Sequence, residues 1–181
     1  MRGVKRALFV AAALAAGSLG ASAAPAPERQ TPSGLPVPRY VSLKFDKVNA
    51  RAGPGDDHRL LWVYRVRGLP VQVVAETAEW RRVCDPQGEL AWVHKRTTDG
   101  RRTVINMTGK PAPLYSRPKE GARVVAYLNP DALASLVRCD KDWCRVRADD
   151  RAGWVAAGEL WGTAEGAQCH PGRTPAPAGG R

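Results

Sequence analysis

The chain has 181 residues, of which 28 are Lys or Arg and 17 are Asp or Glu, giving a formal net charge of +11. This length leaves room for one medium domain or two small ones, and leaves none for a separate catalytic domain beside two small ones. The excess of Lys and Arg over Asp and Glu favours anionic partners, although Lys and Arg side chains also form solvated surfaces that keep a protein soluble.

Residues 1–23 have the features of a secretory signal peptide. Arg2, Lys5 and Arg6 precede a short Ala-rich apolar run, and residues 21–23 form an Ala-Ser-Ala cleavage signal. The run is too short for a membrane anchor, and no transmembrane segment is expected in the mature chain. Cleavage after Ala23 leaves 25 basic and 17 acidic residues, a net +8. We therefore expect an exported protein of the periplasm or the extracellular space, which excludes nucleic acid as a partner.

Two segments have a composition typical of disorder. Residues 24–38 contain five prolines among polar residues, and residues 163–181 contain three prolines and two closing glycines. Such segments bury too little apolar surface to offset the entropy of ordering them. We expect a flexible tether before the folded part and a disordered tail after it.

Short apolar runs follow the tether, separated by turn residues. They lie at residues 40–45, 60–66, 71–75, 80–84, 90–93 and 103–106, and no run outside the signal peptide keeps a helical period over a dozen residues. The spacing of the runs and turns predicts an all-β protein built from small barrels.

The central hairpin pattern occurs twice. Trp80 and Trp92 flank a turn at residues 85–88, and Trp143 and Trp154 flank a turn at residues 148–151, at offsets of 63 and 62. Leu69 and Leu133 continue the repeat upstream. We therefore expect two related barrels, at residues 39–107 and 108–162.

These motifs resemble the bacterial SH3-like domain family. Residues 48–55 (Val-Asn-Ala-Arg-Ala-Gly-Pro-Gly), the strand that starts at Trp80 and the run Ala91-Trp92-Val93 follow the family order N-x-R-x-G-P-G, W-x-x-V and G-W-V. Ala91 replaces a glycine that the second unit keeps as Gly153. The second unit lacks the first of these motifs and has Leu-Tyr-Ser-Arg-Pro at residues 114–118 instead.

The resemblance implies two tandem SH3-like barrels that act as a recognition module and carry no catalytic residues. It also implies a location outside the cytoplasmic membrane and cell-wall material as a ligand. In this family, the position where a strand begins after a polar turn borders a groove in which an aromatic ring can stack on a ligand. The expected ligand-binding residues are Arg51, Trp80 and His94 in the first unit, and Tyr115 and Trp143 in the second.

The remaining tryptophans are expected to pack. Trp92 and Trp154 each lie within a strand, where a large ring usually fills the core of a small barrel. Trp161 is expected to close the second barrel. Partial packing also remains open for Trp80 and Trp143.

Four cysteines in an exported chain suggest two disulfides. Cys139 and Cys144 flank four residues, so a tight hairpin would bring them within bridging distance. Cys84 and Cys169 then either pair, which would fasten the tail to the first unit, or remain as a buried thiol and a free thiol. Their bridge would contribute about 4 kcal/mol on the chain-entropy account.

Enzymatic and metal-binding alternatives have little support. A nucleophilic Cys84 would need a base such as His94, and no third residue that would orient such a pair is evident. The cysteines lack the clustered spacing of a zinc site, so no metal or cofactor is expected.

Basic residues are dense between the two hairpins and are expected to gather at the junction of the units: Arg81, Arg82, Lys95, Arg96, Arg101, Arg102, Lys110, Arg117 and Lys119. Two functions follow from these features. The first is a non-enzymatic envelope module that binds peptidoglycan or its stem peptides. The alternative is a scaffold that binds an extended or proline-rich peptide of another envelope protein.

Overall fold

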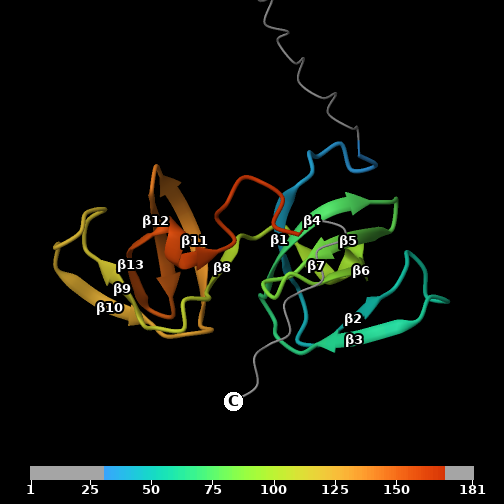
Figure 1. Ribbon diagram of the computed structural model, residues 1–181, viewed down its shortest axis with the longest axis horizontal. Helices are drawn as coiled ribbons and strands as arrows, with labels where there is room; N and C mark the ends of the chain where they lie inside the picture. The colour runs from blue at the N-terminus through green and yellow to red at the C-terminus, as the bar shows by residue number, and fades with distance from the viewer. Residues whose placement is uncertain (1–30, 170–181) are drawn as a thin grey trace, which may run out of the picture.

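A computed structural model describes residues 31–169 as an all-β protein, which confirms the predicted fold class. Its strands form two seven-stranded sheets that lie side by side (Figure 1). Within residues 31–169, no helix is long and apolar enough to span a membrane. The predicted signal peptide and the end of the tail lie outside the described residues.

The first barrel has the strand order β3-β2-β6-β5-β4-β1-β7. Its elements are β1 (Arg39–Leu43), β2 (Val48–Arg51), β3 (Leu60–Tyr64), β4 (Pro70–Glu76), β5 (Trp80–Cys84), β6 (Leu90–His94), the short 3-10 turn η1 (Lys95–Thr97) and β7 (Thr98–Asp99).

The second barrel repeats this order as β10-β9-β13-β12-β11-β8-β14. Its elements are β8 (Thr103–Asn106), β9 (Ala112–Tyr115), β10 (Val124–Leu128), β11 (Leu133–Asp140), β12 (Trp143–Ala148), β13 (Arg151–Ala156), η2 (Ala157–Glu159) and β14 (Leu160–Trp161).

The place of β8 differs from the sequence interpretation, which assigned residues 103–106 to the first unit. In the structure β8 pairs antiparallel with β11 and β14, both of which belong to the second sheet. It thereby takes the position that β1 has in the first barrel, where β1 pairs with β4 and β7. In each sheet the strand at this position, β1 or β8, comes before the other strands of that sheet in the chain.

The β5–β6 hairpin is held at its turn by a buried carboxylate. Oδ1 of Asp85 accepts hydrogen bonds from the backbone N–H groups of Gln87 (3.0 Å) and Glu89 (2.9 Å). Its Oδ2 accepts a hydrogen bond from the hydroxyl of Tyr64 (3.0 Å). Gly88 closes the turn with φ 86°, a conformation that residues with a Cβ rarely adopt. The turn fixes the register that places Trp80 opposite His94 at the other end of the hairpin.

Each barrel has its own apolar core, made by the inward face of alternating strand residues. The core of the first barrel includes Val71, Val73, Val83, Ala91 and Val93. That of the second includes Leu114, Leu128, Cys144, Val146 and Val155.

The barrels also share apolar contacts. Ile105 of β8 belongs to the core cluster of the first barrel, and Leu133 and Trp161 of the second barrel pack against that cluster. The ring of Trp161 lies edge-on to that of Tyr40, with centroids 5.2 Å apart. Trp161 was predicted to close the second barrel; it lies on β14, which pairs with β8 of the same sheet, and its ring also packs at the contact between the barrels.

Both flanking segments are ordered close to the barrels. In the predicted tether, the backbone N–H of Ser33 donates a hydrogen bond to the carboxylate of Glu76 on β4, and Arg39 at the start of β1 donates to the same carboxylate. In the predicted tail, Gln72 donates through Nε2 to the carbonyl of Gly166 and accepts through Oε1 from the N–H of Gln168, both at 2.8 Å. Residues 31–38 and 163–169 are thus part of the folded structure.

Candidate functional site

Three of the predicted binding residues line one pocket in the first barrel. The pocket has a volume of about 230 Å³ and is called the first groove below. Arg51 comes from the end of β2, Trp80 from the start of β5 and His94 from the end of β6. The remaining lining residues are Lys47, Val48, Asn49, Asp56, Arg96 and Thr97.

Trp80 and His94 form a cross-strand pair. They are partners in the antiparallel ladder between β5 and β6, and their ring centroids lie 5.1 Å apart at an interplanar angle of 56°. The backbone N–H of Trp80 donates to Oγ1 of Thr77 (3.1 Å), which ties the start of β5 to the preceding turn. The indole is half-buried, so part of its surface remains open to a ligand.

His94 caps the 3-10 turn that follows β6. Its Nδ1 accepts a hydrogen bond from the backbone N–H of Arg96 (3.2 Å), which leaves the Nε2 position to carry the proton of the neutral ring. Nε2 lies 4.0 Å from a carboxylate oxygen of the exposed Glu79. The ring is thus held in one orientation, with a donor at Nε2.

Arg51 is held by the loop that follows it. Its Nη1 donates to the carbonyl of His58 (2.8 Å), and its Nη2 lies 3.3 Å from Oδ1 of Asp56. The Arg51 side chain is 17% exposed, whereas that of Asp56 is 78% exposed. Water screens this ion pair, so an incoming anion can compete with Asp56 for the guanidinium.

The loop can fold this tightly because of Gly53. A Cβ at this position would lie 2.5 Å from the ring of His58. The glycine of the N-x-R-x-G-P-G motif therefore makes room for His58, whose carbonyl in turn orients Arg51. This structural role of His58 was not predicted from the sequence.

Several lining residues were missed from the sequence. One face of β2 and of the residue before it carries Lys47, Asn49 and Arg51. These residues are two positions apart, and side chains two positions apart in a strand point to the same face of the sheet. That alternation would have indicated Lys47 and Asn49. Arg96 and Thr97 lie in η1, whose short turn has no recognisable sequence signal.

Tyr115 and Trp143 form the corresponding pair in the second barrel. Their rings meet edge to face, with centroids 5.6 Å apart. Tyr115 faces Trp154 across strands as Arg51 faces Trp92, and Trp143 faces Ala156 as Trp80 faces His94. The second barrel thus has an aromatic pair where the first has a guanidinium, an indole and an imidazole.

The two strand tryptophans differ from each other: Trp154 is buried as predicted, and Trp92 is not. Trp92 is half-buried and faces Arg82 and Arg51 across the sheet, while Ala91 and Val93 point into the core. The prediction that Trp92 fills the core was therefore wrong, because the smaller Ala91 and Val93 occupy the inward-facing positions of the strand. Trp154 is 8% exposed, and the guanidinium of Arg138 lies 5.2 Å from its ring centroid.

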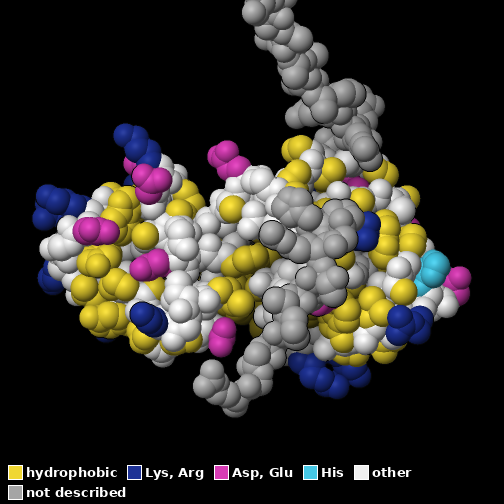
Figure 2. Space-filling view, viewed as in Figure 1, with side chains coloured by type: hydrophobic (Ala, Val, Ile, Leu, Met, Phe, Trp, Pro, Cys, Tyr) yellow, Lys and Arg dark blue, Asp and Glu magenta, His cyan; other side chains and the backbone are white. Residues whose placement is uncertain are grey.

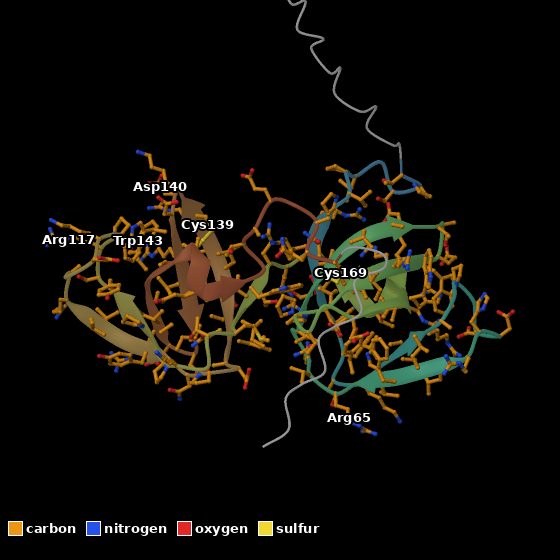
Figure 3. All side chains as sticks on the ribbon, in the orientation of Figure 1. Arg65, Arg117, Cys139, Asp140, Trp143 and Cys169 are labelled. Carbon is orange, nitrogen blue, oxygen red and sulfur yellow. A yellow bond between two sulfur atoms is a disulfide. The ribbon has the colours of Figure 1, made fainter. Side chains whose placement is uncertain are left out.

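The basic residues do not form one patch at the junction. Arg81 lies beside the buried Glu76, and Arg96 lines the first groove. Arg117 lies at the end of the second barrel that is away from the junction (Figure 3). On the face shown in Figure 2, the Lys and Arg side chains are scattered over both barrels. Arg101 and Arg102, together with Arg67, do line a pocket between the barrels.

The predicted Cys139–Cys144 disulfide is present, and so is the Cys84–Cys169 disulfide, which the sequence left open. Cys139 and Cys144 are partners in the β11–β12 ladder, with Cα atoms 4.0 Å apart. Cys84 bonds to Cys169, at a sequence separation of 85 residues, and fastens the segment after β14 to the first barrel (Figure 3). No thiol remains free, so Cys84 cannot act as a nucleophile with His94. Two disulfides fit an exported protein.

Among the residues that the structure describes, no group of three His, Cys, Asp or Glu side chains is placed to hold a metal ion. The first groove instead combines cations, an aromatic face and a hydrogen-bond donor. Such a set suits a ligand that has both a flat or ring-shaped apolar face and an anionic or hydroxyl group.

A match to a known protein family agrees with the two-barrel architecture. The Bacterial SH3 domain family matches residues 44–100 and again 108–162. No curated protein matches the chain.

Among solved structures, the chain is similar to NlpC2 from Trichomonas vaginalis, at 14% identity and a TM-score of 0.32. That match covers 69% of this chain and 48% of NlpC2. NlpC1 from the same organism matches at 14% identity and a TM-score of 0.31, over 68% of this chain and 45% of NlpC1. The chain thus spans about half the length of these two proteins. Its two family matches together cover more than half of its own length, and the chain belongs to the bacterial SH3 domain family.

Proposed function

We propose that this protein is a non-enzymatic binding module of the cell envelope whose first groove recognises peptidoglycan through a sugar or a stem peptide. The observation that carries this proposal is the convergence of Arg51, Trp80 and His94 on one pocket. Bacterial SH3 domains are generally modules that bind the cell wall. We also propose that residues 1–23 direct export, which would bring the module to that ligand.

Each groove residue has a distinct part in this proposal. The half-buried face of Trp80 stacks on a sugar ring or an apolar stem, and Arg51 exchanges Asp56 for a carboxylate of the ligand. His94 donates through Nε2 to a hydroxyl or carbonyl oxygen. Tyr115 and Trp143 lack these polar partners, so the second barrel would contact an apolar or ring-shaped part of the ligand.

The test is co-sedimentation of the purified protein with murein sacculi across a salt series. We expect binding that persists at moderate salt, because stacking is not screened, and that weakens about tenfold or more in Trp80→Ala. Tyr127→Ala is the matched control, since Tyr127 is 63% exposed on β10 and lies outside the first groove. Equal loss in both variants, or binding that disappears as salt rises, would contradict a specific groove.

A second candidate function rests on the edge strand of the first sheet. Within the described residues, β3 pairs with β2 alone. Leu60 on β3 is exposed. An unpaired edge with exposed apolar side chains can accept an extended peptide as an additional strand. If the protein does not sediment with sacculi at any salt concentration, an envelope protein bound in this way becomes the better proposal.

A further inference from the structure

A second pocket lies between the two barrels, apart from both grooves. It has a volume of about 280 Å³. Residues of the first barrel, of the connecting segment and of the second barrel all line it: Ser42, Leu43, Arg67, Gly68, Arg101, Arg102, Thr103, Ser135 and Leu136. No acidic residue is among them.

The walls of this junction pocket are fixed by contacts that cross between the barrels. Oγ of Ser42 lies 2.7 Å from the carbonyl oxygen of Arg101 and 2.6 Å from Oγ1 of Thr103. The hydroxyl of Thr103 in turn donates to the carbonyl of Gly68 (2.6 Å). The pocket is therefore built by the packing of one barrel on the other.

Gly68 brings Arg67 to the pocket. Its φ of 80° lets the β3–β4 turn double back, and a Cβ added there would lie 3.8 Å from Leu133 and 4.0 Å from Thr103, both of the second barrel. The turn thus lies directly against the second barrel. No ion pair joins Arg67 to a carboxylate within residues 31–169.

The other two arginines differ in how they are held. Nη2 of Arg102 donates to the carbonyl of Gly162 (2.7 Å), and its guanidinium lies 5.1 Å from the ring centroid of Tyr40. Burial lowers the pKa of Arg102, and none of its recorded partners is a carboxylate. Arg101 pairs with Asp99 at 2.8 Å, but its side chain is 69% exposed, so this pair is screened by water.

We infer that the junction pocket is a binding site for a small oxyanion group, a carboxylate or a phosphate, gripped by Arg67, Arg101 and Arg102. Three guanidinium groups line one pocket whose wall has no acidic residue, and an anion bound between them would neutralise part of their charge. Guanidinium groups also match the paired oxygens of carboxylate and phosphate. The volume suits such a group or the end of a longer ligand, which would then contact both barrels at once. This site is independent of the ligand proposed for the first groove.

The test is isothermal titration calorimetry of the purified protein at constant ionic strength. One probe is inorganic phosphate, the second is N-acetyl-alanyl-alanine with a free carboxylate, and the amide of that dipeptide is the neutral control. We expect at least one of the two anions to bind, and the tighter one identifies which oxyanion the site takes. The neutral amide should not bind.

Arg67→Gln is the first variant, because Arg67 is exposed and forms no ion pair within residues 31–169. It should weaken anion binding about tenfold or more, and the double variant with Arg101→Gln should abolish it. Arg145→Gln removes the same charge from an exposed position on β12 outside the pocket and should leave binding unchanged.

Failure of both anions to bind the unaltered protein would overturn the inference. So would an equal loss in Arg67→Gln and Arg145→Gln, since that result would show attraction by net charge alone. Neither outcome bears on the first groove, because the Trp80→Ala sedimentation test does not involve the junction arginines.

Discussion

At the scale of single residues, Glu76 shows how burial and hydrogen bonding compete. Its side chain is 1% exposed, and burial alone would raise the pKa of its carboxyl group. Hydrogen bonds from Ser33, Arg39 and Thr31 outweigh burial and lower that pKa from 4.5 to about 2. The charged carboxylate thereby fastens the segment before β1 to β4.

This pKa predicts a dependence of stability on acid. Because the folded pKa is lower than the unfolded one, the stabilisation is complete above pH 4.5 and is lost as the pH falls towards 2. A shift of this size corresponds to about 3 kcal/mol in the free energy of unfolding. Glu76→Gln should lower stability at neutral pH and flatten its change between pH 4.5 and 2, as measured by urea unfolding at several pH values.

The control for this prediction is Glu120→Gln, which changes an exposed glutamate in the second barrel. It should leave both the stability at neutral pH and its acid dependence as they are in the unaltered protein. If Glu76→Gln keeps the full acid dependence, the carboxylates responsible lie elsewhere.

At the scale of the elements, the two hairpins share a register, and one of the inward positions at which they differ is a glycine in the second barrel. Ala91 faces Val83 in the first barrel, and Gly153 faces Val146 in the second. Ala91 is buried in the core of its barrel. At Gly153 an added Cβ would lie 2.7 Å from Cβ of Leu114 and 3.2 Å from its backbone carbonyl carbon. The glycine therefore lets β13 approach β9 more closely than a residue with a Cβ would allow.

Gly153→Ala should accordingly destabilise the protein by about 1–3 kcal/mol, because the clash is with a Cβ and backbone that cannot easily move. The measurement is the free energy of urea unfolding. Gly158→Ala is the control, since an added Cβ there has no neighbour within 4 Å. A Gly153→Ala variant as stable as the unaltered protein would show that the two strands can separate without loss.

At the scale of the whole molecule, the two barrels are joined by more than their connecting segment. Trp161 packs on Tyr40, Gln72 holds the segment after β14, and the Cys84–Cys169 disulfide closes a loop that includes the entire second barrel. A short connection alone does not hold two domains together, whereas these contacts lie at separate points of the interface. We expect the barrels to unfold as one cooperative unit.

The two disulfides should contribute unequally. On the chain-entropy account, a loop of 85 residues gives about 4 kcal/mol and a loop of 5 residues about 2 kcal/mol. Cys84→Ala with Cys169→Ser should therefore lower the free energy of urea unfolding about twice as much as Cys139→Ser with Cys144→Ala. An equal loss, or a larger loss from the short loop, would show that packing around the cysteines outweighs loop closure.

The sequence by itself determined the local features. Alternating apolar residues and turn residues predicted an all-β chain, and the recurrence of Trp80 and Trp92 as Trp143 and Trp154 predicted two tandem barrels. The resemblance of the motifs to the bacterial SH3-like family indicated Arg51, Trp80 and His94, which the structure brings to one pocket. The strands and the repeat could be predicted because strand period, turn chemistry and hairpin register act over a few residues.

The tertiary structure alone decided the features that depend on distant partners. The pattern of β8 suits either sheet, and its pairing with β11 and β14 places it in the second. Trp92 faces outward because Ala91 and Val93 fit the core better. Arg67 lines one pocket with Arg101 and Arg102 because the barrels pack at Gly68, and Cys84 bonds to Cys169 across 85 residues. Contacts of this kind depend on how the chain packs in three dimensions, which no short stretch of sequence specifies.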